Sequence, residues 1–480
     1  MDKQEQLLAG LTFTLQYSNP RIQASLLTEV VDYLPQAIKE AVLKKALIAI
    51  RAISQENDRL NALNGLVRKL SPDLLLEALA IGKALPSTKS RVQALAAIAD
   101  YLPQKIKEDV LTNALTETES MPFESERLSA LQSLSGKLPP NLLPRAIAIT
   151  KALPSGLNRV YAIKVLALKL PPSLLLEALD IARAFRHSNG EYCLALALSA
   201  LAPALPNALR AEAVLEALAA AESIPFENFR DNVYRAGALT AVIDVLPEAL
   251  RAEALQKALN AARAIEEEWC RSTALLSLAS KLPEALRAEI LQEGIETVKQ
   301  EKEDWAIAHI MPFVAANLPP ELLPAVLTRV KTMRSKSYRA EAFIAIAPNL
   351  SSELLPEILI MLKDMRYNAC CASTLVAIAS KLSPELLSEA LSLVEGLQSQ
   401  RDRITVLIAL SAQISKWPEK ARLLAWQTMR HWLSLRTGRW PLLTFRREFS
   451  RCILALSAVI YAVEGQTAVV EALTNPQDYR

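Results

Sequence analysis

A leucine followed by proline or serine returns along most of this chain, and this repeat limits the possible folds more than any other feature. Most intervals are 32 or 36 residues, and the difference of four is about one helical turn. The repeated residues are Leu34, Leu70, Leu102, Leu138, Leu170, Leu205, Leu246, Leu282, Leu318, Leu350 and Leu382, with Ile414 in the twelfth place. Such self-similarity indicates an array of repeats rather than several independent domains.

One repeat can be examined at residues 159–179, RVYAIKVLALKLPPSLLLEAL. Its apolar residues before Pro171 recur three to four positions apart, which places them on one face of a helix. Pro171 and Pro172 end that helix and suit the first turn of a second one. Neither apolar face can be buried within one repeat. We therefore predict an all-α fold, a right-handed α-solenoid of about twelve helix-turn-helix repeats with a period of 32–36 residues.

The ends of the chain differ from the repeats and predict three segments. Residues 1–22 are expected to form an N-terminal capping helix, residues 23–414 the repeat solenoid, and residues 415–480 a helical cap. Residues 415–451 contain nine Lys or Arg against Glu419 and Glu448, a net charge of +7, and four of the six tryptophans lie in this last segment. Basic residues among aromatic ones are compatible with nucleic-acid binding. We favour an aromatic cap with an exposed charged face.

Two polar positions recur beside the apolar ones. An arginine stands eleven residues before the repeated leucine in eight repeats: Arg59, Arg91, Arg127, Arg159, Arg235, Arg271, Arg339 and Arg403. An acid stands seven residues after it in eight repeats: Glu77, Asp109, Glu177, Glu212, Glu253, Glu289, Glu357 and Glu389. We call these sets the arginine series and the acid series.

A cation at the start of a helix is unfavourably placed for the helix dipole. The recurrence of the arginine therefore suggests a fixed partner, most simply an acid of the same or the adjoining repeat. We expect this structural pairing, for example of Arg91 and Arg159 with Glu77, Asp109 and Glu177. The alternative is a basic stripe that binds phosphates, which the equally frequent acids disfavour.

The repeat lengthens around its sixth copy, before two consecutive first helices. The extra residues lie in RHSNGEY at 186–192 and PFENFRDNVYR at 225–235, which we expect to be long loops. Neighbouring loops on one edge of a solenoid often build a binding face, although surface loops also drift in length without consequence. The candidate partner-binding residues are His187, Glu191, Tyr192, Phe226, Phe229, Arg230, Asp231 and Tyr234.

Composition and motifs indicate few other functions. A formal net charge of +3 gives no general preference for nucleic acid or anionic lipid. Five scattered cysteines do not suggest a disulfide framework, and the apolar runs are too short for a membrane span. His187, His309 and His431 are too far apart for a zinc motif, and no phosphate-binding loop is present. We expect a cytoplasmic protein without catalytic residues, metal or cofactor.

The helix pairs resemble α-solenoids of the HEAT or armadillo type. More narrowly, LPPSLLLEAL, LPPELLPAVL, LSSELLPEIL and LSPELLSEAL resemble the leucine/proline-rich helical repeats of cyanobacterial STAND-type NTPases and related signalling proteins. A weaker resemblance is to HEAT-like lyases that attach bilins to light-harvesting proteins. The first resemblance implies a sensor or scaffold that contacts other proteins.

Our functional hypothesis is a non-catalytic protein-interaction scaffold or sensor with a protein partner. A HEAT-like bilin lyase or chaperone and a helical-repeat RNA-binding protein remain as alternatives. Repeat proteins that bind RNA read bases with recurring side chains, whereas the recurring polar residues here are an arginine and an acid. We therefore do not expect a nucleic-acid partner.

Overall fold

The computed structural model describes residues 19–188, 190–225, 229–363, 369–435, 452 and 455–474. Across these ranges the chain forms 25 α-helices joined by short 3₁₀ turns, with no β-strand. The predicted all-α repeat fold is therefore confirmed. Residues 1–18 of the predicted N-terminal capping helix, residues 1–22, lie outside the described residues.

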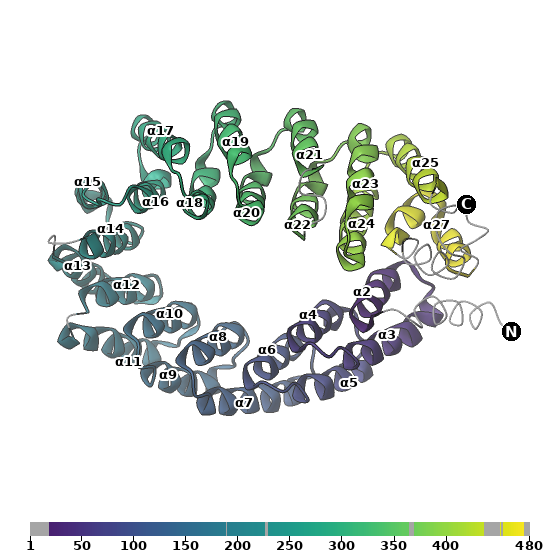
Figure 1. The fold of residues 1–480 in the computed structure, drawn as a ribbon. Coiled ribbons are helices and arrows are strands. Elements are labelled where there is room, and N and C mark those ends of the chain that lie inside the picture. Colours follow the sequence, from purple (N-terminus) through teal and green to yellow (C-terminus); the bar gives the residue numbers. More distant parts are fainter. Residues whose placement is uncertain are drawn as a thin grey trace. The chain divides into compact units, whose positions relative to one another are not determined.

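Twelve consecutive helix pairs account for all but the last of these helices (Figure 1). The first helices of the pairs are α2 (Pro20–Val30), α4 (Glu56–Leu66), α6 (Thr88–Ala99), α8 (Glu124–Leu134), α10 (Gly156–Leu166), α12 (Glu191–Leu201), α14 (Phe229–Ile243), α16 (Glu268–Leu278), α18 (Asp304–Asn317), α20 (Lys336–Ile346), α22 (Ala369–Ile378) and α24 (Gln400–Ile414). The second helices are α3 (Gln36–Arg51), α5 (Pro72–Lys83), α7 (Gln104–Ser120), α9 (Leu143–Lys151), α11 (Pro172–Arg183), α13 (Asn207–Ser223), α15 (Glu248–Arg263), α17 (Glu284–Gln300), α19 (Leu323–Thr332), α21 (Leu355–Lys363), α23 (Leu387–Gly396) and α25 (Glu419–Leu435).

The repeated leucine forms the bend within each pair. Leu34, for example, is extended, with φ −93° and ψ 156°, and follows the 3₁₀ turn Val31–Tyr33. Its side chain is fully buried. The proline after it is extended as well and precedes the first residue of α3. The leucine thus anchors the bend in the core, and the proline prevents the first helix from continuing.

A second buried apolar residue marks the turn between one repeat and the next. It follows the second helix and is at most 4% exposed in nine repeats: Ile53, Leu85, Met121, Leu153, Phe185, Ile224, Ile265, Met333 and Leu397. Serine side chains then cap the start of α6, α10, α20 and α24. Each such cap satisfies a backbone N–H that would otherwise lack a partner.

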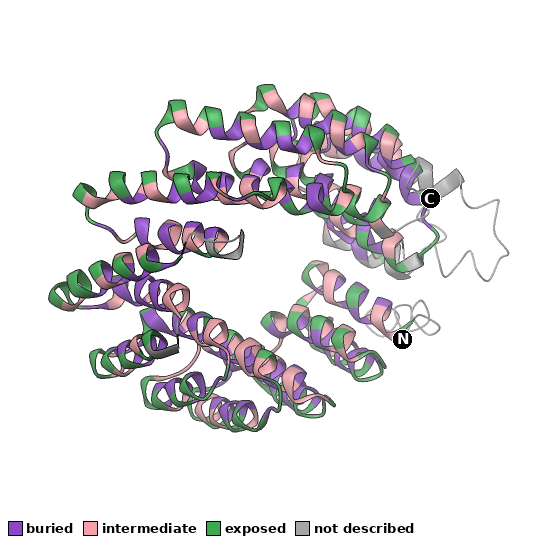
Figure 2. Cartoon of the chain, turned by 60° about the vertical axis from the view of Figure 1, so that its left-hand side comes forward, coloured by how far each residue is buried: buried purple, intermediate pink, exposed green. Residues whose placement is uncertain are grey.

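The chain divides into two compact units, and each is described by itself. Unit 2 comprises residues 75–301. Its first helices pack side by side in one layer, and its second helices form the other layer (Figure 1). The buried residues gather on the helix sides that face other helices (Figure 2).

Unit 1 comprises residues 1–74 and 302–480. In this unit α2 contacts both α24 and the last helix, α27 (Ser457–Thr474). The rings of Tyr33 and Tyr461 lie 5.5 Å apart between centroids. Gly465 interrupts α27 with φ 85°, a backbone conformation that favours glycine.

Ion pairs join the ends of successive first helices. Lys69 pairs with Asp32 at 2.6 Å, and Lys137 with Asp100 and Lys281 with Asp244 repeat the same spacing of 37 residues. The lysine stands one residue before its repeated leucine, and the aspartate two residues before the preceding one. These pairs lie beside the bends and connect adjacent repeats.

Candidate partner-binding surface

The arginine series lies near the starts of the first helices and contacts the turn just before its own helix. Arg91 donates to the carbonyl oxygen of Leu85 at 3.0 Å, and Arg271 to that of Ile265 at 2.9 Å. Arg59 and Arg339 bond the equivalent carbonyls of Ile53 and Met333, Arg235 that of Ile224, and Arg159 that of Pro154. The predicted pairing with Glu77, Asp109 and Glu177 is wrong for the contacts that the structure describes.

The physical reason is that carbonyl groups at the end of a helix lack partners within that helix. Each of these arginines lies near the start of a first helix, but its side chain reaches the end of the preceding second helix. A cation is favourable there because the C-terminal end of a helix dipole is negative. Acids do contribute in two places: Arg91 also bonds Glu117 at 2.9 Å, and Arg271 lies 3.8 Å from Glu293. Arg127, Arg159 and Arg403 keep a buried Nε without a hydrogen-bond partner within the described ranges.

The acid series lies on the second helices and has different partners. Glu289 pairs with Arg263 at 3.0 Å and Glu389 with Lys363 at 3.0 Å, and Glu357 pairs with Lys331. In each pair the cation belongs to the last turn of the preceding second helix, 26 residues earlier. Glu212 pairs with Arg183 and Glu253 with Lys257. The arginine series therefore connects first helices to the turns before them, whereas these acids form ion pairs on the second helices.

The two segments expected to be long loops are partly helical. Glu191 and Tyr192 begin α12 after Gly190, and His187 lies within the short 3₁₀ turn Ala184–Ser188. Phe229, Arg230, Asp231 and Tyr234 belong to the first turns of α14. Phe226 lies outside the described residues. The expected loop at 225–235 is therefore wrong from Phe229 onward, because no proline or glycine follows Pro225 to stop a helix there before Gly237.

Tyr192 and Tyr234 come together despite the 41 intervening residues. Their ring centroids are 4.8 Å apart, with an interplanar angle of 34°. The Tyr192 ring also lies beside Gly237, where an added methyl group would be at an ordinary contact distance of 3.5 Å from it. Burial raises the pKa of Tyr192, and the neighbouring Tyr161, Cys193 and Tyr234 raise it further.

Tyr161, Tyr192 and Tyr234 form what we call the tyrosine cluster, on the neighbouring helices α10, α12 and α14 (Figure 1). Tyr161 is 49% exposed and Tyr234 41%, while Tyr192 is half-buried between them. Offset or tilted aromatic pairs are favourable beyond the area that they bury. The cluster is thus a preformed aromatic surface in which Tyr161 and Tyr234 are substantially exposed.

Sequence reasoning missed that an aromatic residue recurs near the start of five consecutive first helices. Trp269 follows Tyr192 and Tyr234 within unit 2, and Trp305 and Tyr338 hold the equivalent places in unit 1. Each stands 12 or 13 residues before its repeated leucine. Trp305 is 43% exposed and Tyr338 39%. A tabulation of residues at that offset would have revealed the series.

The acids near this aromatic series are accessible, whereas the nearby arginines are engaged. Glu266, Glu267 and Glu268 are exposed at the start of α16. Arg159 lies over the Phe185 ring at 5.0 Å and bonds the Pro154 carbonyl. Arg235 bonds the Ile224 carbonyl at 2.7 Å. The start of α16, the next of the first helices after α14, therefore presents exposed carboxylates, whereas Arg159 and Arg235 are engaged within the chain.

Other kinds of site find little support in the described part of the chain. No group of three residues there could hold a metal ion. None of the five cysteines, all of which lie within the described ranges, forms a disulfide bond. Burial raises the pKa of Cys270 to about 11 and that of Cys371 to about 12, which opposes formation of a reactive thiolate. No described helix is long and apolar enough to cross a bilayer.

Comparisons with known proteins return only distant structural similarity. No protein-family model and no curated protein matches the chain. Kap121p bound to Nup53p is 14% identical with a TM-score of 0.39, over 100% of this chain and 56% of that one. Kap121p bound to Pho4p is 15% identical with a TM-score of 0.37, over 97% and 54%. The chain thus spans about half the length of this karyopherin.

A circular tandem repeat protein with novel repeat topology is also similar, at 12% identity and a TM-score of 0.16, over 99% of this chain and all of that one. Matches this distant carry no information about the partner of this chain. Neither protein is described as a STAND-type NTPase, so that resemblance stays a prediction. The fold rests on the twelve helix pairs themselves.

Proposed function

We propose that this chain is a non-catalytic scaffold that binds an extended segment of another protein at the tyrosine cluster. The observation that carries the proposal is the Tyr192–Tyr234 stack, which holds two aromatic rings in place while leaving Tyr234 41% exposed. Tyrosine supplies a large contact area at low entropic cost. Aromatic side chains are also enriched among the residues that dominate binding energy.

The layered repeats suit an extended partner. Neighbouring helices pack about 8–10 Å apart, which corresponds to about three residues of extended chain at about 3.3 Å each. An apolar or cationic side chain at every third position of such a segment would meet successive first helices. We propose that His187, Glu191, Phe226, Phe229, Arg230 and Asp231 border this binding edge.

Charge further defines the partner. The exposed Glu266, Glu267 and Glu268 favour a segment that carries Lys or Arg. Aromatic ring faces attract the same cations. We propose a basic, extended polypeptide as the partner. Five cysteines without a disulfide bond among them are consistent with a reducing compartment. We further propose a cytoplasmic scaffold or sensor in a signalling system.

A library of 15-residue peptides that differ in net charge tests this function. We expect the chain to retain basic peptides, and Tyr234→Ala to weaken their binding at least about tenfold, the loss of about 1.4 kcal/mol. Tyr101→Ala is the matched control, because Tyr101 is 46% exposed and lies outside the cluster. Retention of acidic peptides, or equal binding by Tyr234→Ala and Tyr101→Ala, would contradict the proposal.

A further inference from the structure

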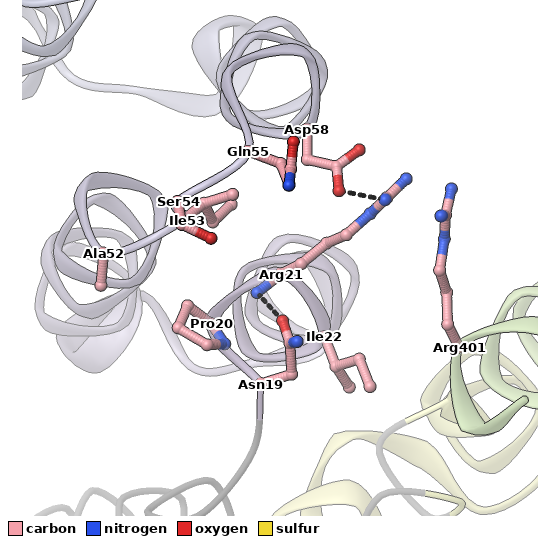
Figure 3. A pocket seen from close by; sticks show the side chains of 10 residues that line it. All are labelled: Asn19, Pro20, Arg21, Ile22, Ala52, Ile53, Ser54, Gln55, Asp58 and Arg401. Carbon is pink, nitrogen blue, oxygen red and sulfur yellow. Dashed lines mark hydrogen bonds and ion pairs between the residues drawn. The ribbon is translucent and has the colours of Figure 1, made fainter.

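Unit 1 contains a pocket of about 210 Å³ that is lined by residues of both its N-terminal and its C-terminal repeats (Figure 3). The first turn of α2 and the turn between α3 and α4 form most of the lining. Arg401, from the first turn of α24, completes it. Residues more than 340 positions apart in the sequence therefore contribute to one small cavity.

Two guanidinium groups line this pocket with one carboxylate. Arg21 pairs with Asp58, and its backbone N–H donates to Asn19 Oδ1 at 2.9 Å. Arg401 is exposed, and no ion pair involves it within the described ranges. Figure 3 shows the side chains of Arg21 and Arg401 turned toward the same end of the pocket. An arginine has five N–H donors, so most of these donors remain available.

The charge balance identifies the kind of ligand. Arg21, Arg401 and Asp58 together carry a charge of about +1 at neutral pH. A monoanion neutralises this sum, whereas a dianion such as hydrogen phosphate leaves an excess negative charge. Guanidinium groups bind planar carboxylates in a bidentate geometry. A carboxylate that receives hydrogen bonds from both arginines would also remove the repulsion between them.

The remaining walls define the rest of the ligand. Pro20, Ile22, Ala52 and Ile53 supply apolar surface, and Ile22 and Ile53 are at most 7% exposed. The volume is below the 300–1,000 Å³ that is typical for drug-sized ligands. The pocket therefore has room for a short apolar stem beside the carboxylate.

We propose that Arg21 and Arg401 form a binding site for a monocarboxylate with a short apolar stem. The ligand is either a small organic acid or the C-terminal carboxylate of a peptide. Binding connects α2 to α24 and so stabilises the contact between the two ends of unit 1. The site lies apart from the tyrosine cluster and does not depend on the function proposed there.

Calorimetric titration of the full chain with butyrate at low salt tests the proposal. We expect saturable binding by the wild type, and at least a tenfold weaker affinity for Arg401→Gln. Arg68→Gln is the matched control, because Arg68 is an exposed arginine outside this pocket. Circular dichroism establishes that each variant remains folded. Absence of butyrate binding to the wild type, together with absence of binding to the peptide acid below, would overturn the proposal, as would equal affinity of Arg401→Gln and Arg68→Gln.

Further ligands separate the two sources and test the charge. If a tripeptide with a free C-terminal carboxylate binds and the same tripeptide with a C-terminal amide does not, the ligand is a polypeptide terminus. If butyrate binds more tightly than the tripeptide, the ligand is a small organic acid. In a buffer basic enough to convert inorganic phosphate to its dianion, phosphate should bind the wild type more weakly than the carboxylate, and Asp58→Asn should shift the preference toward phosphate. Phosphate binding to the wild type as tightly as the better carboxylate would overturn the assignment to a monoanion.

Discussion

Arg91 donates a hydrogen bond from Nη1 to the carbonyl oxygen of Leu85, 3.0 Å away, and so connects the first turn of α6 to the turn that precedes it. The same relationship, from an arginine to the residue six positions earlier, occurs at Arg59, Arg271 and Arg339. In the longer sixth connection, Arg235 reaches Ile224, eleven positions earlier. The contact is kept although the chain between has five more residues.

Arg91→Ala should destabilise the junction between α5 and α6. Arg91 is largely shielded from solvent, with a side chain 24% exposed, and hydrogen bonds to charged groups contribute about 1.5–3 kcal/mol. We expect a loss of about 1–3 kcal/mol of local stability, seen as faster hydrogen exchange in α5 and α6. A local probe is needed because repeat arrays unfold in parts.

Arg145→Ala provides the control for this prediction. Arg145 pairs with Glu119 on the second-helix layer, where both side chains are over a third exposed. Exposed pairs of this kind contribute about 0–1 kcal/mol. An Arg91→Ala effect no larger than that of Arg145→Ala would show that the bond to the Leu85 carbonyl is unimportant for the repeat junction.

The sequence was sufficient for the helix pairs but not for the partners of their polar residues. Proline after Leu170 and the spacing of Ile163 and Leu166 act locally, so they can be recognised without tertiary information. The recurrence of Arg91 and its equivalents could also be recognised in the sequence. The carbonyl group that accepts its hydrogen bond could not be predicted, because every residue carries a backbone carbonyl.

The candidate surfaces were harder to predict from the sequence than the helix pairs. Tyr192 and Tyr234 were both predicted for one edge, but their stacking depends on the packing of α12 against α14, which the sequence does not specify. The aromatic series is hard to recognise in the sequence because its distance from the repeated leucine is 12 residues in some repeats and 13 in others. Arg21 and Arg401 line one pocket because α2 contacts α24, and a repeat period does not predict that contact.

Asp244→Asn should have only a small effect on stability. Its carboxylate pairs with Lys281 but is 65% exposed, and exposed ion pairs contribute about 0–1 kcal/mol. We expect a loss within this range at low salt that largely disappears at 1 M salt, where the screening length falls to about 3 Å. Urea denaturation at both salt concentrations measures it. A loss that persists at 1 M salt would mean that Asp244 stabilises the fold by other means.

Cys270 should react slowly with iodoacetamide in the folded protein. Burial raises its pKa from 9.0 to about 11, so at pH 8 about one thiol in a thousand is ionised, against about one in ten in the unfolded chain. Because the folded pKa is the higher one, the contribution of Cys270 to stability is complete below pH 9 and is lost as the pH rises toward 11.

Peptide mass spectrometry after labelling at pH 8, with and without urea, measures the difference. We expect labelling of Cys270 about 100-fold slower in the folded chain, since the thiolate is the reactive form. The same comparison at pH 11 should show a much smaller difference. Equal labelling of the folded and unfolded chain at pH 8 would contradict the raised pKa.

Gly294→Ala should destabilise the contact between α16 and α17, although alanine favours helices. A methyl group at Gly294 would lie 2.9 Å from both Cδ atoms of Leu276. Leu276 is only 2% exposed and has little room to move. Overpacking a core costs about 1–3 kcal/mol, which exceeds the gain of about 0.8–1.0 kcal/mol in helix propensity.

Gly65→Ala is the opposite case and serves as the matched comparison. Gly65 lies within α4, and a methyl group there meets no atom within 4 Å. The Gly65→Ala substitution should raise the free energy of unfolding by about 0.5–1 kcal/mol, because alanine loses less conformational freedom than glycine when the helix forms. Hydrogen exchange of α4 and of α16–α17 follows the two variants separately. Stabilisation by Gly294→Ala equal to that by Gly65→Ala would mean that Leu276 moves aside freely and that the two helices pack more loosely than their contact distances indicate.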